Sequence, residues 1–597
     1  MARFVSHGSD LVYQAAEAFR DQCLMAEGSL LFDDISLWTA TNLAELHKAF
    51  NAAPDVSQRN FLEKFRDQIR PAGQGVIRLA AEVVAVHFLF PSNVGGARKR
   101  ELIQEVLSWS EDVLPEDRLI CQALNRGIGS GGYGFNARRP FELGYLIDVA
   151  LSWKSKTAQG DLASIQDPWK FRDFLDSVEG GDSRQLRHML LHLFFPDQFE
   201  RIASRDHKWR IDVAFSGLVE NPSDDMDERL LSIRKALEEL LPEAQLDFYQ
   251  TPLSETWYDT AEGSDQFAPL EVIHYKKQIV LYGPPGTGKT HRARSVGERI
   301  IHSAALDKWG AGKYFKNLET VRQSARSHIH VLQLHPAYSY EDFIRGLHLA
   351  NGKTEYRLGF LPKLVVEHIN TESKDTRLPH VLILDEMNRA DLSRLLGECF
   401  SLLEYRDKVV TLPGTDSHGN QLTIEIPSDL YIIGTMNLID QSIEQVDFAL
   451  RRRFLWISCP YDAETLLTVV RGRWDADPAP YNPWDRVEAD FKRLASAASA
   501  LNAAISQSDL LGPQYEIGHT YFFDITSFLR QELQGAKAGR KYFLWRGGRP
   551  MVPVEKLWRL SLRPLLFEYL AGLRGQERED ELGRLEAVFF SSQDPVE

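Results

Sequence analysis

The segment Gly283–Thr290 constrains this chain most, because it fits the phosphate-loop pattern G-x-x-x-x-G-K-[ST] at every required position. It follows an apolar run, Ile279–Leu281, that predicts a strand. Glycines let backbone N–H groups surround phosphate oxygens, while Lys289 reaches the β- and γ-phosphates and Thr290 offers its hydroxyl to Mg²⁺. The predicted phosphate-binding residues are Gly283, Pro284, Pro285, Gly286, Thr287, Gly288, Lys289 and Thr290. We therefore expect a nucleoside triphosphate site, with a helix beginning near Lys289 whose dipole favours the anion.

A second pattern places two acids at the end of a strand. Val381–Leu384 is a run of four apolar residues, which is typical of a buried parallel strand, and Asp385 and Glu386 follow it directly. Such a strand delivers its last residues to the carboxyl edge of the sheet, where ligands bind. We expect Asp385 to complete the Mg²⁺ shell and Glu386 to polarise the attacking water.

Two further elements downstream complete a hydrolytic site. Tyr431–Thr435 predicts another buried strand, and Asn437 just beyond it is positioned to sense the γ-phosphate or orient the water. The segment Asp447–Phe454 has a helical pattern that contains three successive arginines. We expect Arg452 or Arg453 to reach the γ-phosphate of a neighbouring subunit, as arginine fingers do in ring-forming nucleotidases. The alternative is a solvated basic helix end that complements the helix dipole.

With these elements in this order, the chain resembles the AAA+ nucleotidases, and its flanking residues resemble the McrB family within them. The motifs that carry the McrB resemblance are His335–Gly346, Asp385–Ser393, Met436–Asp440, Ala449–Phe454 and Ile517–Phe522. They span roughly residues 275 to 570, about half of the chain. McrB proteins are the motor subunits of modification-dependent restriction systems, so the resemblance implies a hexameric ring, GTP as the nucleotide and a McrC-like nuclease partner.

The resemblance also assigns two weaker site residues. Asp440 falls in the M-N-x-x-D motif, which suggests a guanine contact, but Gln441 stands where the family usually has arginine. GTP is therefore implied by the resemblance alone, and ATP remains open. His519 falls where related proteins carry a second sensor, although a structural histidine is the simpler interpretation.

The interval between Lys289 and Asp385 is far longer than one helix and one strand of a βαβ unit require, so it predicts an insertion. The segment His335–Gly346 begins this insertion, and the family places such an insert near the central pore of its ring. Tyr338 and Phe343 are candidates for pore contacts. Packing of these two aromatic side chains onto the sheet is the alternative.

Composition bounds the remaining possibilities. A length of 597 residues predicts three to four domains, and 43% hydrophobic residues suffice for substantial cores. No apolar run approaches the length of a membrane span, and the four cysteines have no metal-ligand spacing. We expect a cytoplasmic protein with neither disulfides nor a structural metal, and the net charge of −15 argues against extensive wrapping by nucleic acid.

The N-terminal half has mostly helical periodicity and few motifs. Arg98–Arg100 and Arg138–Arg139 are candidates for phosphate contacts with DNA, and the alternative is solvated surface charge. His188 and His192 lie four residues apart but lack a third ligand, which favours a place at the edge of the core. We find no nuclease motif, so cleavage is expected from a separate subunit.

Together these patterns predict an α/β AAA+ core with a parallel sheet and a helical lid, preceded by a mainly helical N-terminal domain. The expected boundaries are 1–255 for a recognition module, 256–460 for the nucleotide-binding core and 461–597 for the lid. The expected function is that of a GTP- or ATP-hydrolysing motor in a McrBC-like DNA restriction or anti-phage defence system. Two alternatives are a MoxR-type ATP-dependent protein remodelling factor and a nucleotide-gated DNA-binding ring without sustained turnover.

Overall fold

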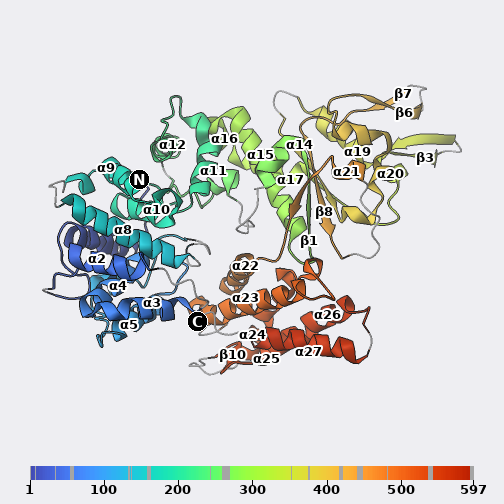
Figure 1. Ribbon diagram of the computed structural model, residues 1–597. Coiled ribbons are helices and arrows are strands. Elements are labelled where there is room, and N and C mark those ends of the chain that lie inside the picture. The colour runs from blue at the N-terminus through green and yellow to red at the C-terminus, as the bar shows by residue number, and fades with distance from the viewer. Residues whose placement is uncertain are drawn as a thin grey trace. The chain divides into compact units, whose positions relative to one another are not determined.

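The structure is a computed structural model of the whole chain (Figure 1). It describes all residues except 1, 7, 34, 54–58, 132–134, 136–137, 158–162, 243, 259–268, 351–352, 374–376, 416–420, 440–447, 480–481, 535–541, 574 and 592–597. The chain divides between Leu253 and Ser254 into two compact units.

Among the residues that the structure describes, the regular elements of the N-terminal unit are helices, apart from one isolated β-bridge between Pro91 and Gly129. Its helices are α1 (Ser9–Ala18), α2 (Ala40–Phe50), α3 (Phe61–Ile69), α4 (Gln74–His87), α5 (Gly96–Ser108), α6 (Leu119–Ala123), α8 (Arg139–Thr157), α9 (Pro168–Ser177), α10 (Gln185–Phe194), α11 (Arg205–Phe215) and α12 (Met226–Leu240). Most of these helices contribute to one large hydrophobic core, which includes the fully buried side chains of Trp38 and Trp153. A helical region thus precedes the nucleotide-binding part, as the sequence predicts.

The second unit begins with α13 (Ser254–Trp257) and α14 (Pro269–Lys276) and contains a five-stranded parallel sheet. The strand order is β2 (Ile329–Gln333), β5 (His380–Asp385), β8 (Leu430–Asn437), β1 (Gln278–Gly283) and β9 (Leu455–Ser458). The strands predicted at Ile279–Leu281, Val381–Leu384 and Tyr431–Thr435 are therefore confirmed as β1, β5 and β8. Their near-continuous burial is what a parallel sheet covered on both faces requires.

Helices cover this sheet on both sides (Figure 1). The long helix α15 (Lys289–Trp309) follows β1 directly, as predicted, and α16 (Ala311–Lys316) and α17 (Leu318–Ser327) lead to β2. Figure 1 shows α15 and α17 on one side of the strands, with α19 (Phe360–Lys363) and α20 (Leu392–Leu396) on the other. The register pairs Gly283 with Asn437, so the phosphate loop and the end of β8 meet at one edge of the sheet.

Two β-hairpins interrupt the alternation of strands and helices. The first follows α18 (Tyr340–Phe343) and pairs β3 (Arg345–Ala350) with β4 (Lys353–Leu358), which confirms an insertion between Lys289 and Asp385. The second pairs β6 (Val410–Thr415) with β7 (Gln421–Ile424), ahead of β8. Figure 1 shows both hairpins projecting from the side of the sheet that carries α19.

The chain after β9 forms a second hydrophobic core of its own. It consists of α22 (Ala463–Ala476), α23 (Trp484–Ser506), α24 (Ile525–Leu533), α25 (Val552–Leu557), α26 (Arg563–Tyr569), α27 (Gln576–Phe590) and the short strands β10 (Trp545–Arg546) and β11 (Arg549–Pro550). We call this part the C-terminal helical region. Within the described residues, none of the helices of either unit combines the length and apolarity needed to cross a bilayer.

Candidate nucleotide site

The phosphate loop connects the end of β1 to the start of α15. Gly286 and Gly288 have φ of 77° and 76°, which is the left-handed region that favours glycine. Gly288 is the residue before the first turn of α15, so the loop passes directly into a helix N-terminus. Backbone N–H groups at such a terminus, together with the helix dipole, provide an anion-binding site.

Lys289 occupies the first turn of α15 and is buried. Its ammonium donates hydrogen bonds to the carbonyl oxygens of Pro284, at 2.6 Å, and Gly283, at 3.2 Å. The lysine therefore extends back across its own loop, where a phosphate chain would lie. These two carbonyl oxygens hold the charged group against the loop.

Three oxygen-bearing side chains meet at the carboxyl end of β5. Thr290 Oγ1 donates to Asp385 Oδ1 at 2.7 Å, and Thr435 Oγ1 donates to the same oxygen at 2.6 Å. Hydroxyl and carboxylate oxygens are the donors that Mg²⁺ prefers. Thr290 and Asp385 therefore fit a magnesium ion, whose charge would neutralise the phosphates of a bound nucleotide.

Glu386 lies beside this oxygen cluster in a left-handed conformation, with φ of 53°, which is uncommon for a residue with a side chain. Its backbone N–H donates to Thr435 Oγ1 at 3.0 Å. Its carboxylate accepts a hydrogen bond from Gln333 Nε2 at 3.2 Å and lies 3.3 Å from Arg389 Nε. The backbone geometry thus directs Glu386 away from the path of β5, and two polar side chains fix its carboxylate.

Asn437 is the last residue of β8, directly opposite Gly283 in the parallel register. Asn388 supports it by donating from Nδ2 to the Asn437 carbonyl at 3.0 Å. The next residue, Leu438, donates its backbone N–H to the Gly283 carbonyl at 3.3 Å. The structure therefore brings Asn437 to the edge of the sheet that carries the phosphate loop, while Asp440 lies outside the described residues.

The two candidate finger arginines differ in their surroundings, although they are neighbours at the end of α21 (Phe448–Arg451). The side chain of Arg452 is 68% exposed and lies 3.7 Å from Glu404. Arg453 is buried, donates to the Ala449 carbonyl at 2.9 Å and covers the ring of Phe400 at 4.1 Å. Arg453 is thus engaged within the core, whereas the side chain of Arg452 is exposed.

The C-terminal helical region contacts the phosphate loop through backbone atoms. Gly518 N donates to the Pro285 carbonyl at 3.1 Å, and Thr520 N donates to the Gly286 carbonyl at 3.0 Å. A Cβ on Gly518 would lie 2.1 Å from the carbonyl carbon of Gly286, so this approach requires glycine. Between these two contacts lies His519.

His519 is buried against the loop, and its Nε2 lies 3.5 Å from where a Cβ on Gly288 would be. Burial is the main cause that lowers its pKa to about 4, and the charge of Lys289 also lowers it. A neutral imidazole is therefore expected at this position near neutral pH. The structure places His519 at the site, which the sequence predicted only by resemblance.

Sequence reasoning missed several polar residues that hold the site together. Thr435, Gln333, Asn388 and Arg389 all contact the predicted site residues. Asn388 and Arg389 lie inside a motif that carries the McrB resemblance, and Thr435 ends a predicted strand, so their positions were available signals. Gln333 gave no signal, because only the pairing of β2 with β5 brings it beside Asp385.

Residues 278–454 match the profile of the AAA domain of the dynein-related subfamily. The McrB subunit of the type IV methyl-directed restriction enzyme EcoKMcrB of Escherichia coli (strain K12) is 31% identical over 261 residues, which are 42% of this chain. The chain carries a AAA+ domain of the McrB type. The match covers 49% of that relative, so the chain spans about half of its length.

A solved structure of a candidate ATPase from Cytophaga hutchinsonii ATCC 33406 covers 54% of this chain and 88% of its own, with 14% identity and a TM-score of 0.22. A likeness at this level carries no argument about the McrB-type domain. The fold of that domain rests instead on its strand order and on the match to the AAA profile. Both agree with the predicted α/β class, and AAA+ domains are nucleoside triphosphatases that use Mg²⁺.

The insertion of the McrB-type domain buries one of its two aromatic candidates. Phe343 is fully buried in the core on the α19 side of the sheet, whereas Tyr338 is half-buried and stands edge-on to the rings of His335 and Phe343. Packing therefore accounts for Phe343. Tyr340, which lies between these two residues in the sequence, donates a hydrogen bond from its hydroxyl to Glu398 at 2.9 Å.

The basic residues of the N-terminal unit do not all lie on the surface, which corrects the expectation of solvated charge. Lys99 is fully buried and donates to the carbonyls of Pro91, at 2.6 Å, and Arg126, at 3.0 Å, and burial lowers its pKa to about 7. Arg139 lies over the ring of Phe88 at 5.2 Å. Only Arg98, Arg100 and Arg138 remain for contacts with phosphates.

The paired histidines of this unit are buried, as the sequence favoured. His192 lies 2.9 Å from the Tyr13 hydroxyl and 2.8 Å from the Phe199 carbonyl, and burial lowers its pKa to about 3. His188 lies between Arg187 and Lys208, which hold the buried carboxylate of Asp227. Both rings therefore serve the core.

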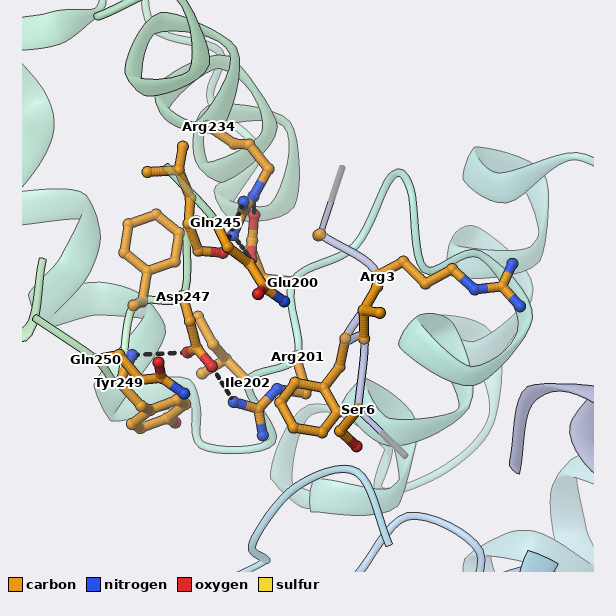
Figure 2. Close-up of a pocket in the computed structure, with 15 residues that line it drawn as sticks. Arg3, Ser6, Glu200, Arg201, Ile202, Arg234, Gln245, Asp247, Tyr249 and Gln250 are labelled. Atoms are coloured by element: carbon orange, nitrogen blue, oxygen red, sulfur yellow. Dashed lines mark hydrogen bonds and ion pairs between the residues drawn. The ribbon is translucent and has the colours of Figure 1, made fainter. Parts of the chain in front are cut away.

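Figure 2 shows a pocket of the N-terminal unit between the first residues of the chain and the segment after α12. Four of its five charged side chains are paired with one another, and the fifth, Arg3, lies 3.8 Å from Asp10. Arg201 lies 2.6 Å from Asp247, and Arg234 donates to Glu200 at 2.7 Å. Because these pairs neutralise the pocket, it does not resemble an anion site, and the nucleotide site of the McrB-type domain remains the main candidate.

Proposed function

We propose that this chain is the ring-forming motor and recognition subunit of a McrBC-like DNA restriction or anti-phage defence system, which hydrolyses GTP in preference to ATP and leaves cleavage to a separate nuclease. The observation that carries this proposal is the convergence of Lys289, Thr290, Asp385 and Glu386 at one sheet edge inside a McrB-type sequence match.

We assign the following roles within this site. Lys289 and the loop N–H groups hold the β- and γ-phosphates, and Thr290 and Asp385 hold Mg²⁺. Glu386 orients and polarises the attacking water, because its carboxylate lies beside Asp385 but is fixed separately by Gln333 and Arg389. Asn437 senses the γ-phosphate from the end of β8.

The position of Arg452 supports the proposed ring. Its exposed guanidinium lies outside the core of its own subunit, so it is suited to complete the site of a neighbour. Arg453 would then hold the Arg452-bearing segment in place by its contacts with Phe400 and Glu404. A hexamer is the expected form of this ring.

The choice of GTP is supported only by the resemblance of the sequence motifs to the McrB family, since Asp440 lies outside the described residues. Residues 1–255 would act as the recognition module, 256–460 as the motor core and 461–597 as the lid that closes on the nucleotide. The hydrogen bonds from Gly518 and Thr520 to the phosphate loop support the lid role.

DNA binding is assigned to the N-terminal unit on its positive charges. Arg98, Arg100 and Arg138 are the candidates for this role, because Arg139 packs over the ring of Phe88. Guanidinium groups suit contacts with phosphates. A cytoplasmic location completes the proposal and is supported by four cysteines that all lack disulfides.

The test is steady-state hydrolysis of GTP and ATP by the purified full-length chain with Mg²⁺, with and without a McrC-like nuclease subunit. A preference for GTP, with faster turnover when the partner is added, supports the proposal. Preference for ATP together with indifference to the partner would overturn it and would direct attention to protein remodelling.

A further inference from the structure

Three potential metal ligands meet at the edge of the sheet opposite the nucleotide site. His328 immediately precedes β2, His380 is the first residue of β5, and the register pairs Ile329 with Val381. Neighbouring residues of paired parallel strands lie side by side about 4.8 Å apart. The two histidines are therefore adjacent because of the strand register, and Glu372 joins them from the segment before β5.

The ligand atoms of the three side chains lie close together. The rings of His328 and His380 stack face to face, with centroids 4.0 Å apart and an interplanar angle of 6°, so one ring must rotate about its side-chain bonds for both nitrogens to point at one ion. Glu372 Oε1 lies 3.3 Å from His328 Nε2 and 3.8 Å from His380 Nε2. One ligand atom from each of the three residues lies within 4.8 Å of the other two. Ligands at the corners of a zinc tetrahedron, with bonds of about 2.0–2.1 Å, are separated by roughly 3.4 Å.

The outer contacts orient both imidazoles toward Glu372. The Pro379 carbonyl lies 3.3 Å from His328 Nδ1 and can only accept, so in the neutral ring the proton is on Nδ1 and the lone pair is on Nε2. His380 Nδ1 lies 3.1 Å from His330 Nε2, a contact that lets His380 present its own Nε2 in the same way. Such outer hydrogen bonds usually fix the tautomer of metal-binding histidines.

His380 is almost completely buried, and its Nε2 has no hydrogen-bond partner among the described residues. A buried nitrogen without a partner is costly, so it indicates a missing interaction. Glu372 is 36% exposed and gives an ion access from solvent.

We propose that His328, Glu372 and His380 bind a transition-metal ion such as Zn²⁺, and that His330 positions His380. Two imidazoles with one carboxylate suit a borderline cation such as Zn²⁺, whereas Mg²⁺ and Ca²⁺ prefer oxygen ligands. With three protein ligands, water completes the shell. The three ligands come from different places in the chain: the residue before β2, the segment before β5 and the first residue of β5.

The role of this site would be to stabilise one end of the sheet by holding β2, β5 and the segment before β5 together. The ion would tie the start of the edge strand β2 to β5 and to the segment that returns from the insertion, before both strands enter the core. The strand β5 separates the ion from Asp385 by five residue steps, roughly 16 Å. The site is therefore distinct from the Mg²⁺ site, and its failure would leave the proposed function standing.

The test uses the full-length chain stripped of metal by a chelator and then dialysed into excess Mg²⁺, which occupies the nucleotide site. Zn²⁺ is titrated against a chromophoric chelator, and Co²⁺ serves as an optical probe of coordination. We expect one Zn²⁺ per chain, visible d–d bands with Co²⁺, and a higher melting temperature with Zn²⁺. Glu372→Gln and His328→Gln should each weaken binding by at least about tenfold and abolish the thermal shift.

Two variants keep the outcome decisive. Glu367→Gln removes an exposed carboxylate a few residues upstream and should bind Zn²⁺ as the parent does. His330→Gln should weaken binding less than removal of a ligand, because it acts through His380. Each variant is first shown to bind nucleotide, which establishes folding. The proposal is overturned if the parent binds no more Zn²⁺ than Glu372→Gln, or if Glu367→Gln loses the ion.

Discussion

Thr290 and Asp385 are joined by a hydrogen bond of 2.7 Å that connects the first turn of α15 to the end of β5. The two residues are far apart in the chain and belong to different motifs. Their contact confirms that the strand bearing the acids lies beside the phosphate loop. It also positions both oxygens before any ion binds, which reduces the cost of ordering them.

Replacement of Asp385 by Asn should remove the charge that holds Mg²⁺ while keeping the shape of the side chain. We expect kcat to fall by roughly 100-fold or more, which corresponds to about 3 kcal/mol of transition-state stabilisation. Steady-state hydrolysis over a range of Mg²⁺ concentrations measures the effect. The control is Asp475→Asn, an exposed acid of α22, and equal rates for both variants would refute the metal role.

Glu386→Gln should bind nucleotide with unchanged affinity but turn it over slowly, because the amide cannot polarise water. Arg389→Ala should have a milder effect, since Arg389 only helps to hold the carboxylate, 3.3 Å away. Nucleotide affinity is measured by equilibrium binding and turnover by phosphate release. Normal turnover by Glu386→Gln would remove this residue from the mechanism.

The two arginines after α21 should separate stability from catalysis. Arg453→Ala removes a buried side chain that packs over Phe400 and lies 3.3 Å from Glu404, and it should lower the free energy of unfolding by about 1–3 kcal/mol. Arg452→Ala should leave stability unchanged and lower turnover.

Mixing Arg452→Ala with Lys289→Ala tests whether the arginine acts across the interface between subunits. Each single variant should be inactive, and the mixture should regain part of the activity, because an intact site then meets an intact arginine. Absence of recovery in confirmed mixed oligomers would argue against a finger in trans.

Gly518→Ala should disturb the contact between the C-terminal helical region and the phosphate loop, because its Cβ would lie 2.1 Å from Gly286. Overpacking of this kind costs about 1–3 kcal/mol, so nucleotide affinity should fall. Gly472→Ala in α22 is the matched control, since no atom lies within 4 Å of its added Cβ. Binding of a fluorescent nucleotide analogue distinguishes the two, and identical affinities would show that the loop adapts freely.

The pH dependence of stability should include His519. Its pKa is about 4 in the folded chain and about 6.5 when unfolded, so the unfolded state binds more protons between these values. The stabilising contribution is therefore complete above pH 6.5 and is lost as the pH falls toward 4, by up to about 3 kcal/mol.

Urea unfolding of the C-terminal helical region at several pH values checks this expectation. His519→Gln should have a shallower dependence on pH in that window, whereas replacement of the exposed His335 should change nothing. A parallel dependence for His519→Gln and the parent would mean that other groups carry the effect.

The sequence predicted those parts of the site that depend on local pattern. The phosphate loop, the strand ending in Asp385 and the strand ending at Asn437 each have a periodicity and a defined end, and the structure contains all three strands. The assigned catalytic roles of these residues stay predictions.

Residues that depend on tertiary register were not predictable in the same way. Gln333 reaches Glu386 only because β2 pairs with β5, and His328 meets His380 for the same reason. The burial of Lys99 and Arg453 could not be predicted from the sequence either, because each lies in a run of basic residues, a pattern that is typical of exposed charge. A basic triplet does not reveal which member faces inward.

The contact of Gly518 with Gly286 has one more consequence. Main-chain hydrogen bonds join the C-terminal helical region to the phosphate loop, and the Thr520 hydroxyl adds a further bond to the Gly286 carbonyl at 3.0 Å. A change in the shape of the loop when phosphates bind or leave would therefore act directly on these contacts. Neither Gly518 nor Gly286 leaves room for a Cβ at this contact, so a side chain at either position would push the loop and the helical region apart.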